Sequence, residues 1–452
     1  MKVNAEIFRE YDIRGVPGRD FDEGFAYELG RAFARLVVEK GGKKVTAGRD
    51  CRLSSPSLSQ ALLKGMLESG LEVTNLGIVT TPMLYFSLYH LNADGGIQVS
   101  GSHNPPDQNG FKVCIGKDTI WGEEIQRVRK IIEKQDYPSG KGMAKDYEIS
   151  AVYVDHIIKN IKLAKPLKVV IDAGNGTAGP VAPRVLRGLK CDLTGLYCEM
   201  DGNFPNHHPD PTVLKNLQEL KDTVLRLKAD VGIGYDGDAD RIGLIDDRGN
   251  VIWGDIIMIL LSRALLKEVP GATVIGEVKC SHRLFDDIAA KGGKAIMWRA
   301  GHSLIKARMK ETGAQLGGEM SGHIFYKHRW FGFDDAIYTS ARILEILSNT
   351  DKKLSELLAD VPPAYSTPEI RIKSSDEKKF EIVEKVKTHF QKLGFQVIDI
   401  DGMRLSFKDG WGLVRASNTQ PMLVMRFEAD TPERMEEIRK MVEEQVNKLN
   451  QV

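Results

Sequence analysis

Cysteine is scarce in this 452-residue chain, which has five, at positions 51, 114, 191, 198 and 280. No two of them have the Cys-x-x-Cys spacing that is typical of zinc ribbons and of redox motifs. An odd, scattered set also excludes the disulfide framework that stabilises many small secreted domains. The cysteine pattern therefore indicates a reducing compartment, and we expect the protein to be cytoplasmic.

The chain also lacks a long apolar run. Its most apolar helical stretch, residues 251–266, contains Asp255 and Arg263. That stretch falls short of the ~18–20 apolar residues that a membrane span needs. The first residues are charged and include no apolar signal-peptide core. We therefore expect a buried core helix at 251–266 and no membrane partner.

Excess charge of one sign is missing as well, because the formal net charge is +1. Proteins that gather nucleic acid or anionic membranes through their overall field carry a strong positive balance. We expect no nucleic-acid partner. Any binding of anions by this chain must come from local clusters of residues.

Three segments of the chain share the pattern strand, turn, helix, strand. Their first strands are expected at 44–50, 167–176 and 272–279, and each is followed by an apolar-periodic helix and a second strand. That pattern predicts βαβ units with a mainly parallel sheet. The spacing of over 100 residues between the units indicates three similar domains rather than a short-period solenoid.

The C-terminal part of the chain has a different character. It follows a stretch with three prolines at 359–369. Amphipathic helices are expected at 380–394 and 433–450, with strands at 397–407 and 423–429 between them. This order predicts a smaller α+β domain.

The stretch VSGSHNPPDQNG, residues 99–110, places Ser102 between a glycine and a histidine and follows it with two prolines. A serine nucleophile needs a base within hydrogen-bond reach, but neighbouring side chains such as Ser102 and His103 rarely converge. The loop also lacks the G-x-S-x-G pattern of hydrolases. A structural loop and a stiff loop that presents the Ser102 hydroxyl both remain open, with Lys112 as a candidate neighbour.

The stretch GIGYDGDADRIGLID, residues 232–246, alternates three aspartates with small residues and continues with Arg241. Carboxylates at Asp236, Asp238 and Asp240 in a tight loop predict a site for a hard divalent cation. An EF-hand is excluded because Arg241 stands where that loop needs glycine. A solvated acidic turn is the alternative, and the apolar residues on both sides disfavour it.

The stretch GGEMSGHIF, residues 317–325, alternates Glu319, Ser321 and His323. In an extended segment these three side chains point to the same face. A carboxylate, a hydroxyl and an imidazole on one face suit a polyol. A polar strand edge explains the pattern equally well.

The stretch RASNTQPMLVMRFEA, residues 415–429, opens with hydrogen-bond donors. Arg415, Ser417, Asn418 and Thr419 offer a guanidinium, two hydroxyls, an amide and turn N–H groups, which together suit a phosphate. An ordinary turn stabilised by serine and threonine remains the alternative.

Lys279 and His302 follow two of the expected strands, where α/β domains bind ligands. His207 and His208 stand in a proline-containing loop. They are candidate metal ligands, but a structural role is the favoured interpretation.

Taken together, the four stretches resemble the α-D-phosphohexomutase superfamily over essentially the whole chain. GSHNPP is similar to its phosphoserine loop, DGDADR to its magnesium loop, GEMSGH to its sugar-binding loop and RASNT to its phosphate-binding loop. The opening FREYDIRG and the GEMSGH loop resemble the phosphomannomutase/phosphoglucomutase branch. Phosphoglucosamine mutases are similar but usually carry glutamine where this chain has Met320.

The resemblance implies a four-domain, heart-shaped α/β molecule. Three related mixed-sheet α/β domains would surround a central cleft, and a smaller C-terminal α+β domain would close over it. The domains would cover residues 1–146, 147–249, 250–361 and 362–452.

The resemblance also implies an activity. Ser102 would carry a phosphoryl group and exchange it with hexose phosphates, the expected partners, through a hexose 1,6-bisphosphate. Mg²⁺ would be held by Asp236, Asp238, Asp240 and the phosphorylated Ser102. The implied catalytic residues are Ser102, Lys112, His323, Arg241 and Arg14. The implied substrate-binding residues are Tyr11, Lys279, His302, Glu319, Ser321, Arg415, Ser417, Asn418 and Thr419.

Three alternatives remain open for this activity: a phosphoglucosamine mutase, a metal-dependent sugar phosphatase, and a phosphosugar-binding regulator without catalysis. The general base is also open between Lys112 and His323. The sequence does not indicate an oligomeric state.

Overall fold

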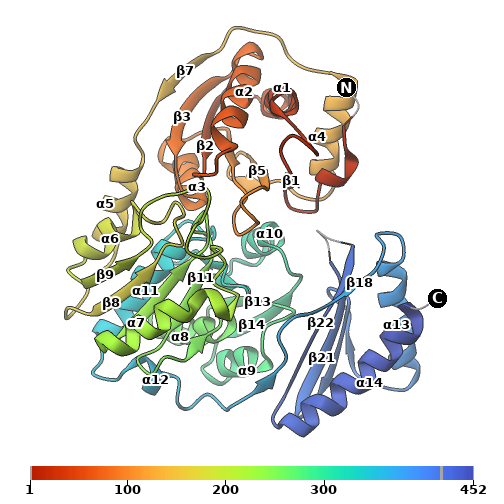
Figure 1. Ribbon diagram of the computed structural model, residues 1–452. Helices are drawn as coiled ribbons and strands as arrows, with labels where there is room; N and C mark the ends of the chain where they lie inside the picture. The colour runs from red at the N-terminus through yellow and green to blue at the C-terminus, as the bar shows by residue number, and fades with distance from the viewer. Residues whose placement is uncertain (1–2, 418–420, 451–452) are drawn as a thin grey trace.

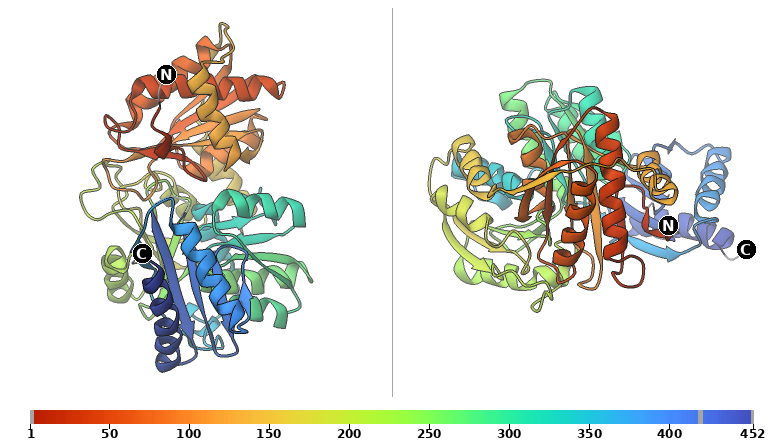
Figure 2. Two further views of the ribbon diagram at one scale, coloured as in Figure 1. Left: turned by 90° about the vertical axis from the view of Figure 1, so that its right-hand side faces the viewer. Right: turned by 90° about the horizontal axis from the view of Figure 1, so that it is seen from above.

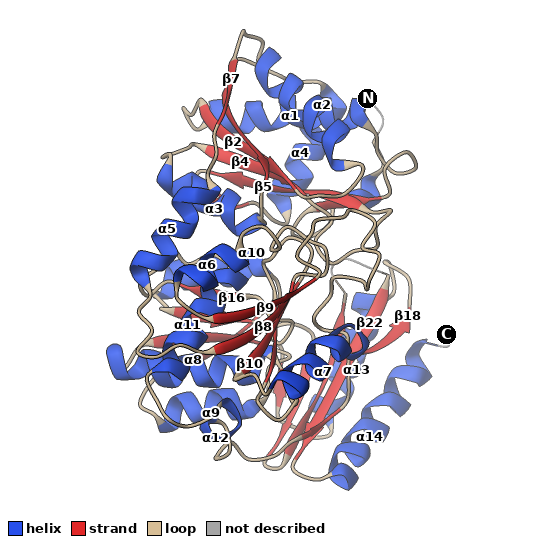
Figure 3. Ribbon diagram, turned by 60° about the vertical axis from the view of Figure 1, so that its left-hand side comes forward, coloured by secondary structure: helices blue, strands red, loops and turns tan. Residues whose placement is uncertain are grey.

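The computed structural model describes residues 3–417 and 421–450, and the strands within them form four sheets. Figure 1 shows four units, with the first (red to orange) above the second and third (yellow-green and green to cyan) and the fourth (blue) at one side. Seen from above, the fourth unit projects to one side of the other three (Figure 2). In Figure 3 the loops gather where the upper sheet faces the lower ones.

The first unit has a sheet of seven strands in the order β1-β5-β4-β2-β3-β7, with β6 paired to β5. Helices pack on this sheet; α1, for instance, starts after Asp22, whose side chain accepts the Phe25 N–H. The strands are β1 (Ile13–Gly15), β2 (Lys44–Arg49), β3 (Glu72–Ile78), β4 (Gly95–Val99), β5 (Asn109–Ile115), β6 (Asp118–Thr119) and β7 (Met143–Asp146). The helices are the 3-10 turn η1 (Ala5–Ile7), α1 (Glu23–Glu39), α2 (Ser55–Glu68), α3 (Thr81–His90) and α4 (Glu123–Lys134).

The second unit has a five-stranded sheet in the order β12-β11-β10-β8-β9. Its strands are β8 (Lys168–Asp172), β9 (Asp192–Leu196), β10 (Val231–Tyr235), β11 (Ile242–Ile245) and β12 (Val251–Ile252). Its helices are α5 (Ser150–Asn160), α6 (Ala182–Gly188), the 3-10 turn η2 (Leu214–Leu217) and α7 (Gln218–Leu227).

The third unit has a four-stranded sheet in the order β14-β13-β15-β16. Its strands are β13 (Thr273–Glu277), β14 (Lys294–Trp298), β15 (Leu316–Gly318) and β16 (Ile324–Tyr326). Its helices are α8 (Gly254–Glu268), α9 (His282–Ala290), α10 (His302–Thr312), α11 (Ala336–Ser348) and α12 (Leu354–Leu357). Helix α8 confirms the buried core helix expected at 251–266, since side chains such as Met258 and Ile259 are fully buried.

The first three units share one strand order. The orders β3-β2-β4-β5, β9-β8-β10-β11 and β14-β13-β15-β16 are equivalent, with two parallel pairings followed by one antiparallel pairing in each. In each unit, the first two strands of this shared order and the helix between them are the predicted βαβ segment. The expected fold class of three related mixed-sheet α/β domains is therefore confirmed.

This shared topology places three of the four motif loops at the same point of each unit. The connection from the third to the fourth strand of the common order is residues 100–108, 236–241 and 319–323 in turn. In the fourth unit, residues 417–421 join β21 to β22, although 418–420 lie outside the described residues. Each loop leaves the carboxyl end of a strand, which is where open α/β sheets bind ligands.

The fourth unit is an antiparallel sheet with the order β17-β22-β21-β20-β19 and with β18 paired to β22. Helices α13 and α14 contact each other and β21, and so cover one face of the sheet. The elements are β17 (Tyr365–Ser366), β18 (Ile370–Lys373), α13 (Lys379–Lys392), β19 (Val397–Ile398), β20 (Met403–Phe407), β21 (Gly410–Ala416), β22 (Met422–Ala429) and α14 (Pro432–Asn450). The α+β prediction is confirmed, but β21 was not among the expected strands.

Side-chain alternation along β21 and β22 gives this sheet two different faces. Val414, Met425 and Phe427 belong to the core beneath the two helices. Their neighbours Trp411 and Arg426 take the opposite face and meet the third unit, where Trp411 packs with Val278 and Arg426 donates to the Lys279 carbonyl. The fourth unit thus meets the third through one strand face that carries both charged and apolar groups.

Within the described residues, no helix combines the length and apolar character that crossing a membrane requires.

Candidate active site

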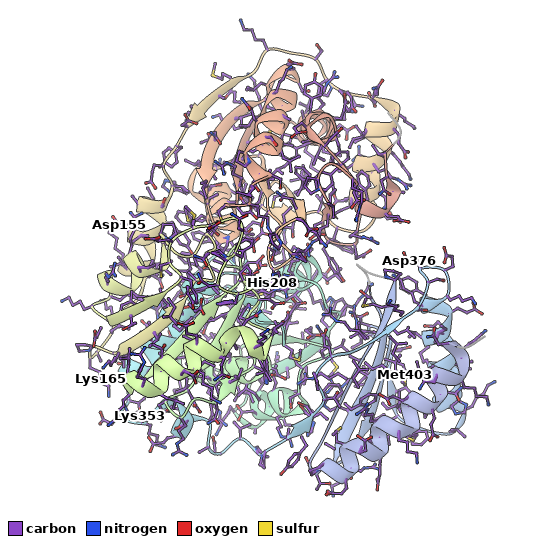
Figure 4. All side chains as sticks on the ribbon, viewed as in Figure 1. Asp155, Lys165, His208, Lys353, Asp376 and Met403 are labelled. Atoms are coloured by element: carbon purple, nitrogen blue, oxygen red, sulfur yellow. The ribbon has the colours of Figure 1, made fainter. Side chains whose placement is uncertain are left out.

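A cavity of about 950 Å³ lies where the four units meet. His208, labelled in Figure 4, is one of the residues that line this cavity. The structure brings most of the sequence-predicted site residues to this one cavity: Tyr11, Arg14, Ser102, Lys112, Arg241, Lys279, His302, Glu319, Ser321, His323, Arg415 and Ser417. Asn418 and Thr419 lie outside the described residues.

Ser102 is held in place by bonds to its own loop and to the second unit. The residue is 2 % exposed, and its φ of 49° lies in the left-handed region. The Ser102 N–H donates to the Ser100 hydroxyl at 2.9 Å. The Ser102 hydroxyl donates to Asp236 Oδ2 at 2.8 Å and lies 3.2 Å from His103 Nδ1. Burial and the cations Arg241 and Arg14 hold the pKa of His103 well below its usual value, so His103 is neutral.

The three aspartates of the 236–240 loop are fully buried and meet at one point. Asp236 Oδ1 accepts the backbone N–H groups of Asp240 and Arg241, both at 3.1 Å. Burial first, and then the charges of Asp240 and Asp238, raise the pKa of Asp236 well above its usual value. Among the described residues, none donates a hydrogen bond to Asp238 Oδ1 or Asp240 Oδ1. Buried carboxylate oxygens without donors are the groups that a hard divalent cation binds, so these residues could hold a metal ion.

Lys112 balances part of this negative charge. Its Nζ donates to Asp238 Oδ2 at 2.8 Å and also to Asp240. Burial opposes the charged form of Lys112, but Asp238 and Asp240 outweigh it and raise its pKa above the usual value. Lys112, Thr81 and Ser100 likewise outweigh burial at Asp238 and lower its pKa. Lys112 is therefore a charged ammonium and has no lone pair with which to accept a proton.

His323 lies beside the aspartates, with Arg241 at one ring nitrogen and Asp334 near the other. Arg241 Nε donates to His323 Nε2 at 2.9 Å. This bond assigns the ring proton to Nδ1, which lies 3.0 Å from Asp334 Oδ2. Asp240, His323 and Asp334 could also be grouped as metal ligands. A metal on Nδ1 would have to displace that proton, so we interpret this group as a histidine–aspartate pair.

The segment Glu319–His323 is a tight turn, and the expectation that it is extended was wrong. Strands β15 and β16 pair as a hairpin, and the turn is closed by bonds from Glu319 N–H to the His323 carbonyl and from Gly322 N–H to the Glu319 carbonyl. Glu319, Ser321 and His323 nevertheless all line the cavity. The turn gathers them because it reverses the chain, not because a strand aligns them.

Arg415 and Lys279 form the cationic end of the cavity, and each is paired with a carboxylate. Arg415 Nε and Nη2 lie 3.1 and 3.0 Å from Asp401 Oδ2. Lys279 Nζ donates to Glu369 Oε1 at 2.8 Å. The Ser417 carbonyl accepts from Lys379 Nζ at 2.6 Å.

The first unit contributes Tyr11 and Arg14 to the cavity. The Tyr11 hydroxyl donates to the Ala300 carbonyl at 2.6 Å, which joins the first unit to the third. Arg14 pairs with Asp12 and donates to Asn104 Oδ1 at 3.3 Å, so it lies against the serine loop.

Comparison with known proteins agrees with this geometry. Models of the four phosphoglucomutase/phosphomannomutase domains match in order: alpha/beta/alpha domain I at residues 5–139, domain II at 151–249, domain III at 253–365 and the C-terminal domain at 369–445. The chain belongs to the phosphoglucomutase/phosphomannomutase family.

Relatives of this phosphohexomutase match it almost end to end. A phosphomannomutase/phosphoglucomutase of Pseudomonas aeruginosa is 46 % identical over 98 % of this chain and 96 % of its own. A phosphoglucomutase of Neisseria gonorrhoeae is 46 % identical over 96 % and 95 %. The crystal structure of a phosphoglucomutase/phosphomannomutase family protein from Burkholderia thailandensis is 41 % identical, with a TM-score of 0.94 over 99 % and 98 %.

Sequence reasoning missed Arg52, whose side chain holds the serine loop of this phosphohexomutase by hydrogen bonds to the loop backbone. Arg52 is fully buried and pairs with Asp50 at 3.1 Å. Its guanidinium donates to four carbonyls of the loop, those of Ser102 (2.7 Å), Asn104 (2.6 Å), Gln108 (3.0 Å) and Pro105. The only signal in the sequence was the charged Asp-Cys-Arg run directly after β2, and it did not indicate the partners of Arg52.

Asp334 and Asp401 were also missed. The carboxylate of Asp334 lies beside the predicted site residue His323, and that of Asp401 forms an ion pair with Arg415. Neither stands in one of the four motif stretches, so nothing in their local sequence indicated a role.

We expect Arg52→Lys to lower both the stability and the activity of the enzyme. An ammonium cannot reproduce the planar fork that reaches four carbonyls, so buried acceptors would lose their donors. The free energy of unfolding should fall by about 2–3 kcal/mol, and kcat/KM by at least about tenfold. Thermal unfolding and steady-state kinetics measure the two effects.

The matched control for this variant is Arg127→Lys, because Arg127 is half-exposed on α4 and pairs with Glu39. It should leave both quantities unchanged. Wild-type activity in Arg52→Lys would contradict the role given to Arg52.

Proposed function

We propose that this enzyme transfers a phosphoryl group reversibly between the 1- and 6-positions of mannose and glucose phosphates. The transfer runs through phospho-Ser102 and a hexose 1,6-bisphosphate. One observation carries the proposal: the cavity holds two separate groups that suit a phosphate. The buried Ser102 hydroxyl, bonded to Asp236, lies at one place, and a cationic end with Arg415 lies at another. A hydrolase needs one phosphate site, whereas a mutase has to hold a phosphate at each end of the sugar.

The chemistry consists of two transfers that mirror each other. In the first, the bond from phosphorus to Ser102 Oγ breaks, a bond from phosphorus to the free sugar oxygen forms, and the sugar hydroxyl loses its proton to a base. The 1,6-bisphosphate then turns end over end. In the second transfer, Ser102 Oγ takes back the other phosphoryl group, and the proton returns to the sugar oxygen that is released.

His323 is the group that we propose as base. Lys112 is a charged ammonium bound to Asp238 and Asp240, so it serves as a counter-charge to the transferring phosphoryl oxygens. His323 Nε2 has its lone pair directed to Arg241 Nε. When Arg241 turns its N–H groups to the phosphoryl group instead, His323 Nε2 becomes able to accept the sugar proton.

A divalent cation, which we propose is Mg²⁺, would be held by Asp236, Asp238, Asp240 and a phosphoryl oxygen on Ser102. When bound, it supplies positive charge that neutralises the transferring phosphoryl oxygens. Arg14 and Arg241 line the cavity on the same side and share that task.

The far end of the cavity fixes which sugar carbon faces Ser102. Arg415, Ser417, Asn418 and Thr419 would hold the phosphate that does not react, with Tyr11, Lys279 and His302 lining the approach. Glu319 and Ser321 would bind sugar hydroxyls O3 and O4, which are presented similarly in both orientations. Since none of these groups distinguishes C2, where glucose and mannose differ, both sugars should be accepted. The name of the Pseudomonas aeruginosa relative, phosphomannomutase/phosphoglucomutase, supports this breadth.

Ser102→Ala should lose at least about a thousandfold in kcat even when glucose 1,6-bisphosphate is supplied, because no other group can carry the phosphoryl group. The wild-type protein should show an intact mass about 80 Da above the chain mass after incubation with the bisphosphate, and the variant should not. Ser57→Ala, at an exposed serine on α2, should behave as the wild type. Wild-type turnover in Ser102→Ala would disprove the phosphoserine route.

Mg²⁺ should raise the temperature of thermal unfolding, because it binds carboxylates that only the folded chain brings together. At a hundredfold excess over Kd, one-site binding adds about 2.7 kcal/mol of stability. Asp236→Asn should abolish this shift, whereas Asp192→Asn, at an exposed aspartate of β9, should retain it. An equal shift in all three proteins would exclude the 236–240 loop as the metal site.

Rates on three sugars distinguish the proposed activity from that of a phosphoglucosamine mutase. We expect kcat/KM for glucose 1-phosphate and mannose 1-phosphate to agree within about tenfold, and that for glucosamine 1-phosphate to be at least about tenfold lower. The reason is that an ammonium at C2 would lie in a cavity already lined by cations. A preference for glucosamine 1-phosphate would favour the other activity, and inorganic phosphate as main product would favour a phosphatase.

A further inference from the structure

One carboxylate oxygen joins the fourth unit to the third at the edge of the cavity. Asp401 Oδ2 lies 3.1 Å from Arg415 Nε and 3.0 Å from Arg415 Nη2. The same oxygen accepts the backbone N–H of Ala300 at 3.0 Å. The side chains of Asp401 and Arg415 are about nine-tenths buried, at 10 % and 9 % exposure, so water competes little for these bonds.

The turn that carries Ala300 is bonded by three different parts of the molecule. The Ala300 carbonyl accepts the Tyr11 hydroxyl of the first unit at 2.6 Å. The N–H of the next residue, Gly301, donates to Glu319 Oε1 at 2.6 Å. Gly301 has a φ of 130°, and a Cβ on it would lie 2.4 Å from the Tyr11 ring, so the turn admits no side chain here.

Asp401 is placed by an equally tight turn between β19 and β20. Gly402 follows it with a φ of 84°. A Cβ on Gly402 would lie 2.4 Å from the Val414 carbonyl and 2.8 Å from the Arg415 Cα. The β19–β20 turn therefore packs directly on β21, which carries Arg415. This backbone contact sets the distance between the side chains of Asp401 and Arg415.

We propose that Asp401 is a positioning residue for the distal phosphate site. It holds the guanidinium of Arg415 by its Nε–Nη2 edge and thereby fixes the plane in which Arg415 meets a phosphate. Through Ala300 it ties that orientation to the turn that also bonds Tyr11 and Glu319. This inference rests on the proposed function, since it takes Arg415 to bind the phosphate that does not react.

The consequence is a coupling between the two ends of the substrate. A phosphate that binds Arg415 finds it already oriented and pays no cost for ordering a long side chain. The sugar hydroxyls meet Glu319, whose Oε1 is bonded to the same turn. Without Asp401, Arg415 would still be a cation in the cavity, but its direction and the position of the turn would no longer be fixed together.

The test is a set of variants on the 399–402 turn assayed with glucose 1-phosphate. Asp401→Ala should raise KM by about tenfold or more, with a smaller loss in kcat, because the clamp binds ground and transition states alike. Asp401→Asn keeps an oxygen for the Ala300 N–H but loses the charge facing Arg415, so its KM should lie between those of Asp401→Ala and the wild type. Asp399→Ala, on the same turn at 61 % exposure, should leave KM unchanged.

A double-mutant cycle with Arg415→Ala separates a positioning role from a structural one. If Asp401 acts through Arg415, Asp401→Ala should change KM by less than about twofold in the Arg415→Ala background. Fully multiplicative effects of the two substitutions would overturn the proposal. The proposal would also be overturned if Arg415→Ala raised KM while Asp401→Asn and Asp401→Ala both kept the wild-type KM.

Failure of the proposed function would look different, because Arg415→Ala would then leave KM for glucose 1-phosphate unchanged. Thermal unfolding is measured on every variant. If Asp401→Ala does not fold, the cycle is run with Asp401→Asn, for which we expect coupling to Arg415→Ala as well. An absence of coupling in that cycle would overturn the proposal.

Discussion

Burial of the carboxylates of Asp236, Asp238 and Asp240 is the constraint on which the arrangement of the first two units depends. Charged groups removed from water need donors or counter-charges, and a single loop cannot supply them all. The first unit supplies the hydroxyl of Ser102 to Asp236 and those of Thr81 and Ser100 to Asp238, as well as the ammonium of Lys112. The same bonds that satisfy the aspartates bring the Ser102 hydroxyl to them. The contacts between the first and second units therefore also form the proposed phosphoryl-transfer site.

A repeated topology delivers the remaining loops to the same place. Each of the first three sheets carries its motif loop at the connection from the third to the fourth strand of a common order, and the fourth sheet carries its motif loop at the β21–β22 connection. A hairpin connection at the end of a sheet can change its side chains without disturbing the strands that hold it. The first three loops carry different groups on related sheets: a hydroxyl, carboxylates and a mixed polar turn. The guanidinium of Arg415 stands at the end of β21, directly before the fourth loop.

Three basic side chains of the cavity are accompanied by carboxylates from another element. Arg415 pairs with Asp401, and Lys279 pairs with Glu369 of the fourth unit. His323 likewise faces Asp334. A cavity lined by unpaired cations would bear a large desolvation cost before any phosphate arrived, and these carboxylates reduce it. They also fix the orientation of each donor, which is the property that a phosphoryl-transfer site needs most.

The sequence by itself determined the local features. The three βαβ units, the C-terminal α+β unit and the four motif loops depend on residues close together in the chain, whose periodicity and turn chemistry are visible in one dimension. The prediction failed where a pattern fitted two geometries, since the alternation at Glu319–His323 suits a strand and a hairpin turn alike. Only the tertiary structure decided the roles of Arg52, Asp334 and Asp401. Their partners come from other elements, so their functions exist only after the chain has folded, and burial then makes each of those bonds strong.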